Sequence, residues 1–180
     1  MAKKKVRRHF ILVSVFVSVI CLSLPSGKAE ERKEQSITLQ ECTDKILGFK
    51  MYCNPNWGLE TEKGSVSMII AEGPVSVTAM ITKMEEPDLT LNDLTPVYLK
   101  ATGQYQDAMK ISSTHLQNYD LIHVEALALK NAQTQLSDYY IIRKPYLYGV
   151  LFSVDPKEKF ADYKALFDKM IDSFLISDGQ

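Results

Sequence analysis

The 180-residue chain contains few of the residues that mark several common classes of protein. Its 8 glycines and 7 prolines are too few for a collagen-like or linker-dominated chain. It has only 3 histidines and 3 cysteines. It also lacks the glycine-rich phosphate loop, the GxSxG serine elbow, the HExxH zinc motif and the dinucleotide glycine pattern. These absences remove the enzyme classes that such motifs identify, although a site assembled from scattered residues would leave no motif.

The remaining composition is that of a folded protein. Hydrophobic residues make up 46% and charged residues 24% of the chain, which excludes a wholly disordered polypeptide. The length suits one ordinary domain. Charge is placed unevenly, because 6 basic residues precede residue 30 and every acidic residue lies at or after Glu30.

The first 29 residues have the pattern of a secretory signal peptide. Residues 3–9 (KKKVRRH) are basic, residues 10–24 carry no charge, and the small residues Gly27 and Ala29 fit a cleavage site. The alternative is an uncleaved membrane anchor, but 15 helical residues span about 22 Å and the hydrocarbon core is about 30 Å thick. We expect export to the periplasm or outside the cell, with a membrane link only through this segment if it is retained.

Two other export signals match less well. A lipoprotein needs a small residue before its acylated cysteine, and Ile20 precedes Cys21. Arg7 and Arg8 partly match a twin-arginine signal, but the usual flanking residues are absent, which favours ordinary secretion.

Without this leader, 15 basic residues face 22 acidic ones, a net charge of about −7. Affinity for nucleic acid comes largely from basic side chains that neutralise phosphates. We therefore expect no nucleic-acid partner.

Removal of the leader would also leave two cysteines, Cys42 and Cys53. An even number of cysteines in an oxidising compartment favours a disulfide between them. Two free structural thiols are the alternative. A metal site is disfavoured, because two thiols with ten residues between them and no nearby histidine do not provide four ligands.

The rest of the chain has alternating strand patterns and two helical patterns. Residues 30–44 are interpreted as a loose lead-in, and the domain as residues 45–176. Period-two runs predict strands at 49–53, 57–60, 66–71, 75–82, 111–117, 120–129, 135–144 and 146–154.

The helical patterns complete the fold class. A spacing of three and four predicts a helix from about Thr95 to Lys110, with Thr95 as its N-cap and Pro96 in its first turn. A second helix is expected after Asp155, taken as its N-cap, with one apolar face from Phe160 to Phe174. This order of elements predicts a single α+β domain with an antiparallel sheet flanked by helices.

Several of these segments resemble the PsbP-like proteins. Gly48, Phe49, Pro55 and Trp57 are similar to the opening strand of that family. The run 148–153 (YGVLFS) and the run 167–174 (FDKMIDSF) are similar to its last strand and its closing helix. The resemblance implies an α/β/α sandwich in an exported, non-catalytic protein. Named members of this family are extrinsic subunits on the lumenal side of photosystem II, where they help to retain calcium and chloride. The resemblance therefore also implies that this protein binds calcium.

Two groups of polar side chains are candidates for chemistry. His123 shares a strand face with Glu125, which could form a base or metal pair, but a surface strand face with a cross-strand partner is the favoured interpretation. His115 is the other histidine after the leader. The acidic residues Glu85, Glu86, Asp88 and Asp93 could bind a hard cation, yet they lack EF-hand spacing, and a solvated loop is favoured.

Aromatic residues form a third group. Tyr139, Tyr140, Tyr146 and Tyr148 cluster in the last predicted hairpin. Aromatic surfaces often mark interfaces, but alternation places Tyr146 and Tyr148 on one face, where core packing would account for them.

The leading hypothesis is an exported, non-enzymatic binding or accessory protein, with a protein, small ligand or ion as its partner. A hydrolase with a scattered site is the alternative, and a deep pocket with His115 or His123 beside a serine or carboxylate would support it. A structural envelope protein without a ligand is the third possibility.

Export predicts loss of residues 1–29. Mass spectrometry of the periplasmic or secreted fraction should find a chain that begins near Glu30. An intact chain that begins at Met1 and is recovered from the membrane would contradict this prediction.

Overall fold

The structure is a computed structural model that describes residues 38–62, 64–72, 74–116 and 119–177. All of these residues belong to one compact unit, Ser36–Gln180. The predicted signal peptide, residues 1–29, lies outside the described residues, as do residues 30–37 of the predicted lead-in.

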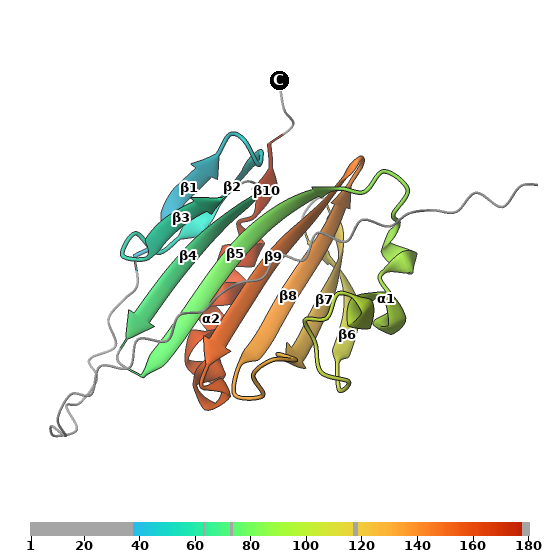
Figure 1. The fold of residues 1–180 in the computed structure, drawn as a ribbon. Helices are drawn as coiled ribbons and strands as arrows, with labels where there is room; N and C mark the ends of the chain where they lie inside the picture. Colours follow the sequence, from blue (N-terminus) through green and yellow to red (C-terminus); the bar gives the residue numbers. More distant parts are fainter. Residues whose placement is uncertain (1–37, 63, 73, 117–118, 178–180) are drawn as a thin grey trace, which may run out of the picture. The chain divides into compact units, whose positions relative to one another are not determined.

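A seven-stranded antiparallel sheet forms the centre of this unit (Figure 1). Its strands in spatial order are β3 (Gly58–Glu62), β4 (Ser65–Glu72), β5 (Val75–Glu85), β9 (Tyr146–Asp155), β8 (Gln135–Arg143), β7 (Tyr119–Leu127) and β6 (Lys110–Leu116). The β4–β5 pair and the β6–β9 meander confirm the pairings expected from the short connections. The long β5–β9 pairing joins these two parts of the chain into one sheet.

A second sheet contains β1 (Gln40–Asp44), β2 (Phe49–Cys53) and β10 (Leu175–Ile176) in the order β1-β2-β10. Part of the predicted lead-in 30–44 is therefore wrong, because Gln40–Asp44 pairs with β2 along its whole length. This segment is held as a strand by its backbone hydrogen bonds to β2. Hydrophobic alternation does not predict the strand, because β1 is polar and mostly exposed.

Helix α2 (Phe160–Asp172) follows a 3-10 turn at Lys157–Lys159. Its predicted apolar face is confirmed: Tyr163, Phe167, Met170 and the following Phe174 are buried. The predicted N-cap is wrong, because Asp155 ends β9 and its carboxylate accepts hydrogen bonds from Asn131 and Thr134 instead. These contacts tie the β7–β8 connection to the end of β9.

Helix α1 (Pro96–Ala101) is shorter than the predicted helix from Thr95 to Lys110. Its predicted start is confirmed, since Thr95 Oγ1 accepts a hydrogen bond from the Tyr98 amide at 3.3 Å. The helix ends early because Gly103 adopts a φ of +71°, a conformation that glycine accommodates most easily. The chain then extends, and Tyr105 forms a β-bridge with Ala128 on the sheet.

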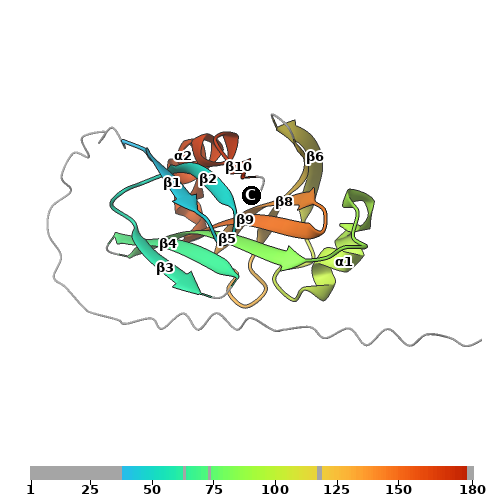
Figure 2. The ribbon, with the colours of Figure 1, turned by 90° about the horizontal axis from the view of Figure 1, so that it is seen from above.

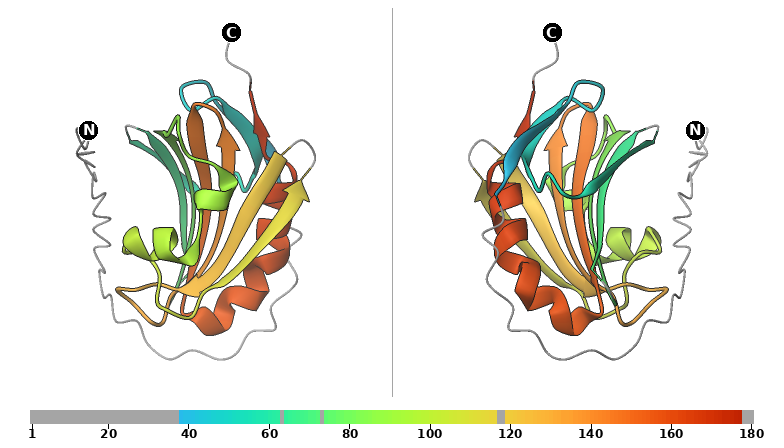
Figure 3. Two further views of the ribbon diagram at one scale, coloured as in Figure 1. Left: turned by 90° about the vertical axis from the view of Figure 1, so that its right-hand side faces the viewer. Right: turned by 90° about the vertical axis from the view of Figure 1, so that its left-hand side faces the viewer.

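The layers match the α/β/α arrangement that the resemblance implies. Helix α2 and the small sheet lie on one face of the large sheet, and α1 lies on the other (Figures 2 and 3). The larger apolar cluster lies on the α2 side, where Phe152 of β9 stacks on Phe167 of α2 with ring centroids 4.4 Å apart. A smaller cluster beneath the α1 segment contains Leu94, Leu99 and Tyr105. With 6 and 13 residues, neither described helix has the length needed to span a bilayer.

The two cysteines of the small sheet face each other. Cys42 of β1 and Cys53 of β2 have Cα atoms 5.9 Å apart, within the range found for disulfides. Cys53 is buried and Cys42 is half-buried. The predicted pairing is confirmed as a pair at disulfide distance, and its oxidation in the isolated protein remains a prediction.

A Cys42–Cys53 bridge would close a loop with a sequence separation of 11. Reduction should lower the free energy of unfolding by about 3 kcal/mol, because it releases the unfolded chain from that loop. Urea titrations with and without reductant measure this change, and a Cys42→Ser/Cys53→Ser double variant should not respond to reductant. Quantitative alkylation of both thiols in the denatured, unreduced protein would contradict the bridge.

Candidate functional site: a polar groove beside helix α2

An open groove with a volume of about 440 Å³ lies between α2 and the strands β6, β7 and β8. Both polar and apolar residues line it. Those from the strands are Ser112, Thr114, Leu121, His123 and Tyr139, and those from the helix are Lys164, Asp168, Ile171 and Asp172.

The sheet register places these strand residues on one face. Ser112 pairs with His123, and His123 pairs with Tyr139, so the three side chains form a row across β6, β7 and β8. Directly opposed residues of an antiparallel ladder point to the same side. On α2, Lys164, Asp168 and Asp172 lie one turn apart, which brings all three to one side of the helix.

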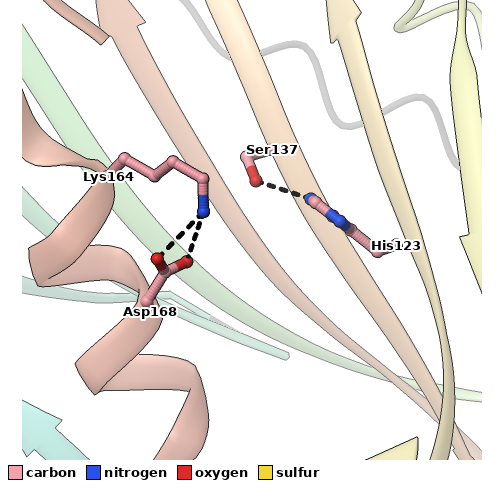
Figure 4. Close-up of polar contacts among 4 residues, drawn as sticks. All are labelled: His123, Ser137, Lys164 and Asp168. Atoms are coloured by element: carbon pink, nitrogen blue, oxygen red, sulfur yellow. Dashed lines mark hydrogen bonds and ion pairs between the residues drawn. The ribbon is translucent and has the colours of Figure 1, made fainter. Parts of the chain in front are cut away.

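His123 is the best-anchored polar side chain of the groove. Its Nε2 lies 2.8 Å from Ser137 Oγ (Figure 4). Its ring stacks on Tyr139 with centroids 4.2 Å apart. Burial lowers the pKa of His123, although the nearby Glu125 acts in the opposite direction. The imidazole is therefore held in place and is mostly neutral near pH 7.

The helix side of the groove contains an ion pair. Lys164 Nζ lies 2.8 and 2.9 Å from the two oxygens of Asp168, four residues later on α2 (Figure 4). The hydrogen bond to Asp168 raises the pKa of Lys164. Both side chains are about half exposed, so the pair contributes at most about 0.5 kcal/mol to stability. Its charges remain accessible to a bound molecule.

The contact between Ser137 and His123 tests the hydrolase alternative. Ser137 is only 3% exposed, so a substrate carbonyl has no path to its hydroxyl. The other ring nitrogen of His123 has no hydrogen-bond partner among the described residues, whereas a catalytic dyad needs a group that orients its base. The geometry fits a structural hydrogen bond better than an activated nucleophile.

The predicted polar residues do not come together as one site. His123 and Glu125 share a strand face as predicted, the cross-strand partner of His123 is Tyr139, and its hydrogen bond goes diagonally to Ser137. His115 lies 3.0 Å from Asp120 on the opposite face of β6 from Ser112 and Thr114, so it is not part of the groove.

The acidic residues after β5 also serve local structure. Asp93 accepts hydrogen bonds from the backbone and side chain of Thr90, which lower its pKa. Glu85, Glu86 and Asp88 lie in the exposed end of β5 and the loop that follows it. No group of three or more His, Cys, Asp or Glu positioned to hold a metal ion occurs in the described part of the chain.

The tyrosines of the last hairpin do not form the exposed aromatic surface that was the alternative to core packing. Tyr139, Tyr140 and Tyr148 are buried and Tyr146 is half-buried. Tyr146 and Tyr148 share a face as alternation predicts, and Lys83 Nζ lies 4.3 Å from the centre of the Tyr146 ring. Core packing therefore explains these residues, because both faces of β8 and β9 are covered.

A larger depression of about 640 Å³ lies on the other side of α2, next to β1 and β2. Ser173 lies in its wall, where Oγ accepts a hydrogen bond from the Tyr52 amide and donates one to the Met170 carbonyl. These bonds connect α2 to the small sheet. The depression is thus a structural junction, and we place the candidate site in the groove next to His123.

The most unusual polar group was not singled out from the sequence. Asp138 of β8 is 2% exposed and faces the smaller apolar cluster. Its Oδ2 accepts a hydrogen bond of 2.6 Å from the Tyr105 hydroxyl, which also contacts the Tyr140 hydroxyl. The backbone amide of Phe152 lies near enough to favour the ionised form of the Asp138 carboxyl group. The Oδ1 atom of Asp138 nevertheless has no hydrogen bond of standard geometry among the described residues. The signal available in the sequence was an acidic residue directly before the apolar run 139–142 of a predicted strand.

Comparison with known proteins identifies the fold. No family model matches the chain, and no curated protein matches its sequence. A cyanobacterial PsbP (CyanoP) from Synechocystis sp. PCC 6803 superposes with a TM-score of 0.56 at 17% identity, covering 82% of this chain and 98% of that one. This similarity confirms the PsbP-like fold that the sequence resemblance implies.

Two further solved structures have the same fold. LpqN of Mycobacterium tuberculosis, involved in cell envelope biogenesis, gives a TM-score of 0.52 at 12% identity over 80% of this chain and 93% of that one. PA94 of Pseudomonas aeruginosa, a protein of unknown function, gives 0.52 at 10% identity over 74% and 94%.

Asp138 predicts a dependence of stability on pH. Burial raises the pKa of Asp138 to about 7 from an ordinary value of 3.8, although the hydrogen bonds from Tyr105 and Phe152 oppose the shift. The native protein then holds a proton that the unfolded chain releases. The free energy of unfolding should fall by on the order of 4 kcal/mol as the pH rises from about 4 to 7, and this contribution levels off above pH 7.

Urea titrations at several pH values measure this effect as the difference between the wild type and Asp138→Asn. The comparison is needed because His123 also makes stability depend on pH. Its pKa is lowered in the native state, so the unfolded chain binds a proton more readily, and the free energy of unfolding falls as the pH drops below the ordinary histidine pKa of 6.5. Asp88→Asn, at an exposed loop position, is the control and should follow the wild type. A difference between wild type and Asp138→Asn that stays constant with pH would show that Asp138 does not titrate in this range.

Proposed function

We propose that this protein is an exported, non-enzymatic accessory protein of PsbP-like fold, which binds a partner through the groove beside α2. The observation that carries the proposal is the combination of accessible charges and a buried hydroxyl in that groove. Lys164, Asp168 and His123 can contact a bound molecule, while Ser137 is covered. Such a site favours recognition over bond cleavage.

Two observations support action outside the cytoplasm. The leader has the charge and hydrophobicity of an export signal. Cys42 and Cys53 lie at disulfide distance, which suits an oxidising compartment. Among proteins of the same fold, LpqN is involved in cell envelope biogenesis, which agrees with a role at the envelope.

A protein is the partner that the groove fits best. The groove is open, and its lining mixes hydroxyl, carboxylate, ammonium and aromatic groups. Small-molecule sites are usually more enclosed and more apolar. A calcium ion held between Asp168 or Asp172 and a partner would use the same surface, so calcium is included in the experiment.

Partner capture tests this proposal. Asp168→Lys reverses a charge in the groove and breaks only an exposed ion pair, so the variant should fold. Wild-type protein should recover a stoichiometric partner from the native envelope fraction, and Asp168→Lys should recover at least about tenfold less, since like charges placed across an interface oppose binding. Glu158→Lys, exposed and outside the groove, is the matched control and should capture as the wild type does.

Three results would argue against the proposal. One is equal capture by Asp168→Lys and wild type. Another is failure to recover a partner, together with no thermal shift on addition of calcium chloride. The third is turnover of an esterase, peptidase or glycosidase substrate that is abolished by both His123→Ala and Ser137→Ala, which would establish the hydrolase alternative.

A further inference from the structure

The two edges of the large sheet differ in how they are protected. In the described residues, β3 and β6 are the terminal strands of the sheet, and each is paired on one side only. Edge strands expose unpaired N–H and C=O groups, and proteins commonly block them with charged side chains, proline or bulges. On β3, Glu60 and Glu62 are exposed and supply such charges.

Strand β6 has much weaker protection. Its seven residues, Lys110–Leu116, pair with β7 in unbroken register, without a bulge or proline. Ser112, Ser113 and Thr114 at its centre are exposed and uncharged. A seven-residue edge of this kind is long enough for another strand to add to it.

The groove lies along the same edge. Ser112 and Thr114 of β6 form part of its lining, so a strand added to β6 would extend the sheet along the open side of the groove. Neighbouring strands lie about 4.8 Å apart, which places the side chains of an added strand next to this lining. Every second side chain would face the groove, and the others would face the side where Ile111 packs against the smaller apolar cluster.

The charges around the groove favour a basic occupant. Asp168 and Asp172 line it, and Glu125 acts on both His123 and Lys164. These three carboxylates face two ammonium groups, Lys164 and Lys110, and Lys164 is already paired with Asp168. A lysine or arginine on the occupant would balance the excess negative charge.

We propose that an extended segment of the partner protein adds to β6 as a further strand, with a lysine or arginine side chain turned into the groove. The proposal rests on the proposed function and specifies how the partner is held. Backbone hydrogen bonds to β6 supply affinity, and the carboxylates of the groove select the basic side chain.

Three capped heptapeptides test this mode of binding. The first alternates lysine and valine, the second alternates glutamate and valine, and the third is the lysine peptide with every backbone amide N-methylated. The third keeps the charges and the side chains but has no amide N–H to donate from either edge. Backbone amide shifts of Ile111–His115 should change with the lysine peptide at millimolar concentration. N-methylation should weaken binding by about tenfold or more, because several hydrogen bonds are lost.

Two variants of α2 test the charge. Asp168→Asn should weaken binding of the lysine peptide by about threefold to tenfold, the effect expected for loss of one charge contact at a partly exposed site. Asp162→Asn, on the same helix but outside the groove lining, is the control and should bind as the wild type does.

Each contrary outcome overturns a definite part of the proposal. Equal binding of the N-methylated peptide excludes strand addition, and equal binding of the glutamate peptide excludes selection by charge. Unchanged β6 amides exclude this edge as the binding surface. Loss of envelope partner capture in Asp168→Lys, combined with unchanged β6 amides, would leave the proposed function in place and reject only strand addition.

Discussion

The packing of α2 on the large sheet is the contact on which the other features depend. Phe167 stacks on Phe152 at the centre of this contact, and Met170 and Phe174 continue the buried face towards the small sheet. Phe174, which follows the helix, stacks on Phe49 of β2, so the helix and the residues after it join the two sheets. Burial of these large aromatic side chains provides most of the energy that holds the helix at one angle. In this position α2 covers β9 and β8 but leaves part of β7 and β6 open, and the groove lies in this uncovered part.

Strand β8 connects the two halves of the structure. Ser137 and Tyr139 face α2, where they hold His123, and the intervening Asp138 faces the α1 side, where it meets Tyr105. Alternation along one strand therefore places the lining of the polar groove and a buried titratable group at adjacent positions on opposite faces of the sheet. The α1 segment reaches the buried Asp138 of the sheet through the hydroxyl of Tyr105, which follows the early end of the helix at Gly103.

Sequence patterns predicted most of the fold because hydrophobic alternation and helical spacing report directly on burial. Val75, Val77, Ala79 and Ile81 are all buried, as their alternation predicts. The predicted helix from Thr95 to Lys110 was too long because its apolar spacing has another cause. Leu94 and Tyr105 fit a helical spacing, but both reach the same apolar cluster from either side of a glycine turn. The groove could be predicted only in part. The hydrogen bond between His123 and Ser137 depends on strand register, and Lys164 and Asp168 reach the groove from a helix that is distant in sequence.

The alternation of β8 also limits how its length can vary. Removal or addition of one residue within Gln135–Arg143 would turn Asp138 towards the aromatic cluster and turn Tyr139 away from His123. Both faces would lose their partners at once, whereas length changes in the exposed Leu129–Gln133 connection would leave the ladder intact. Homologous chains should therefore differ by insertions and deletions in that connection, while the spacing between Ser137, Asp138 and Tyr139 stays constant.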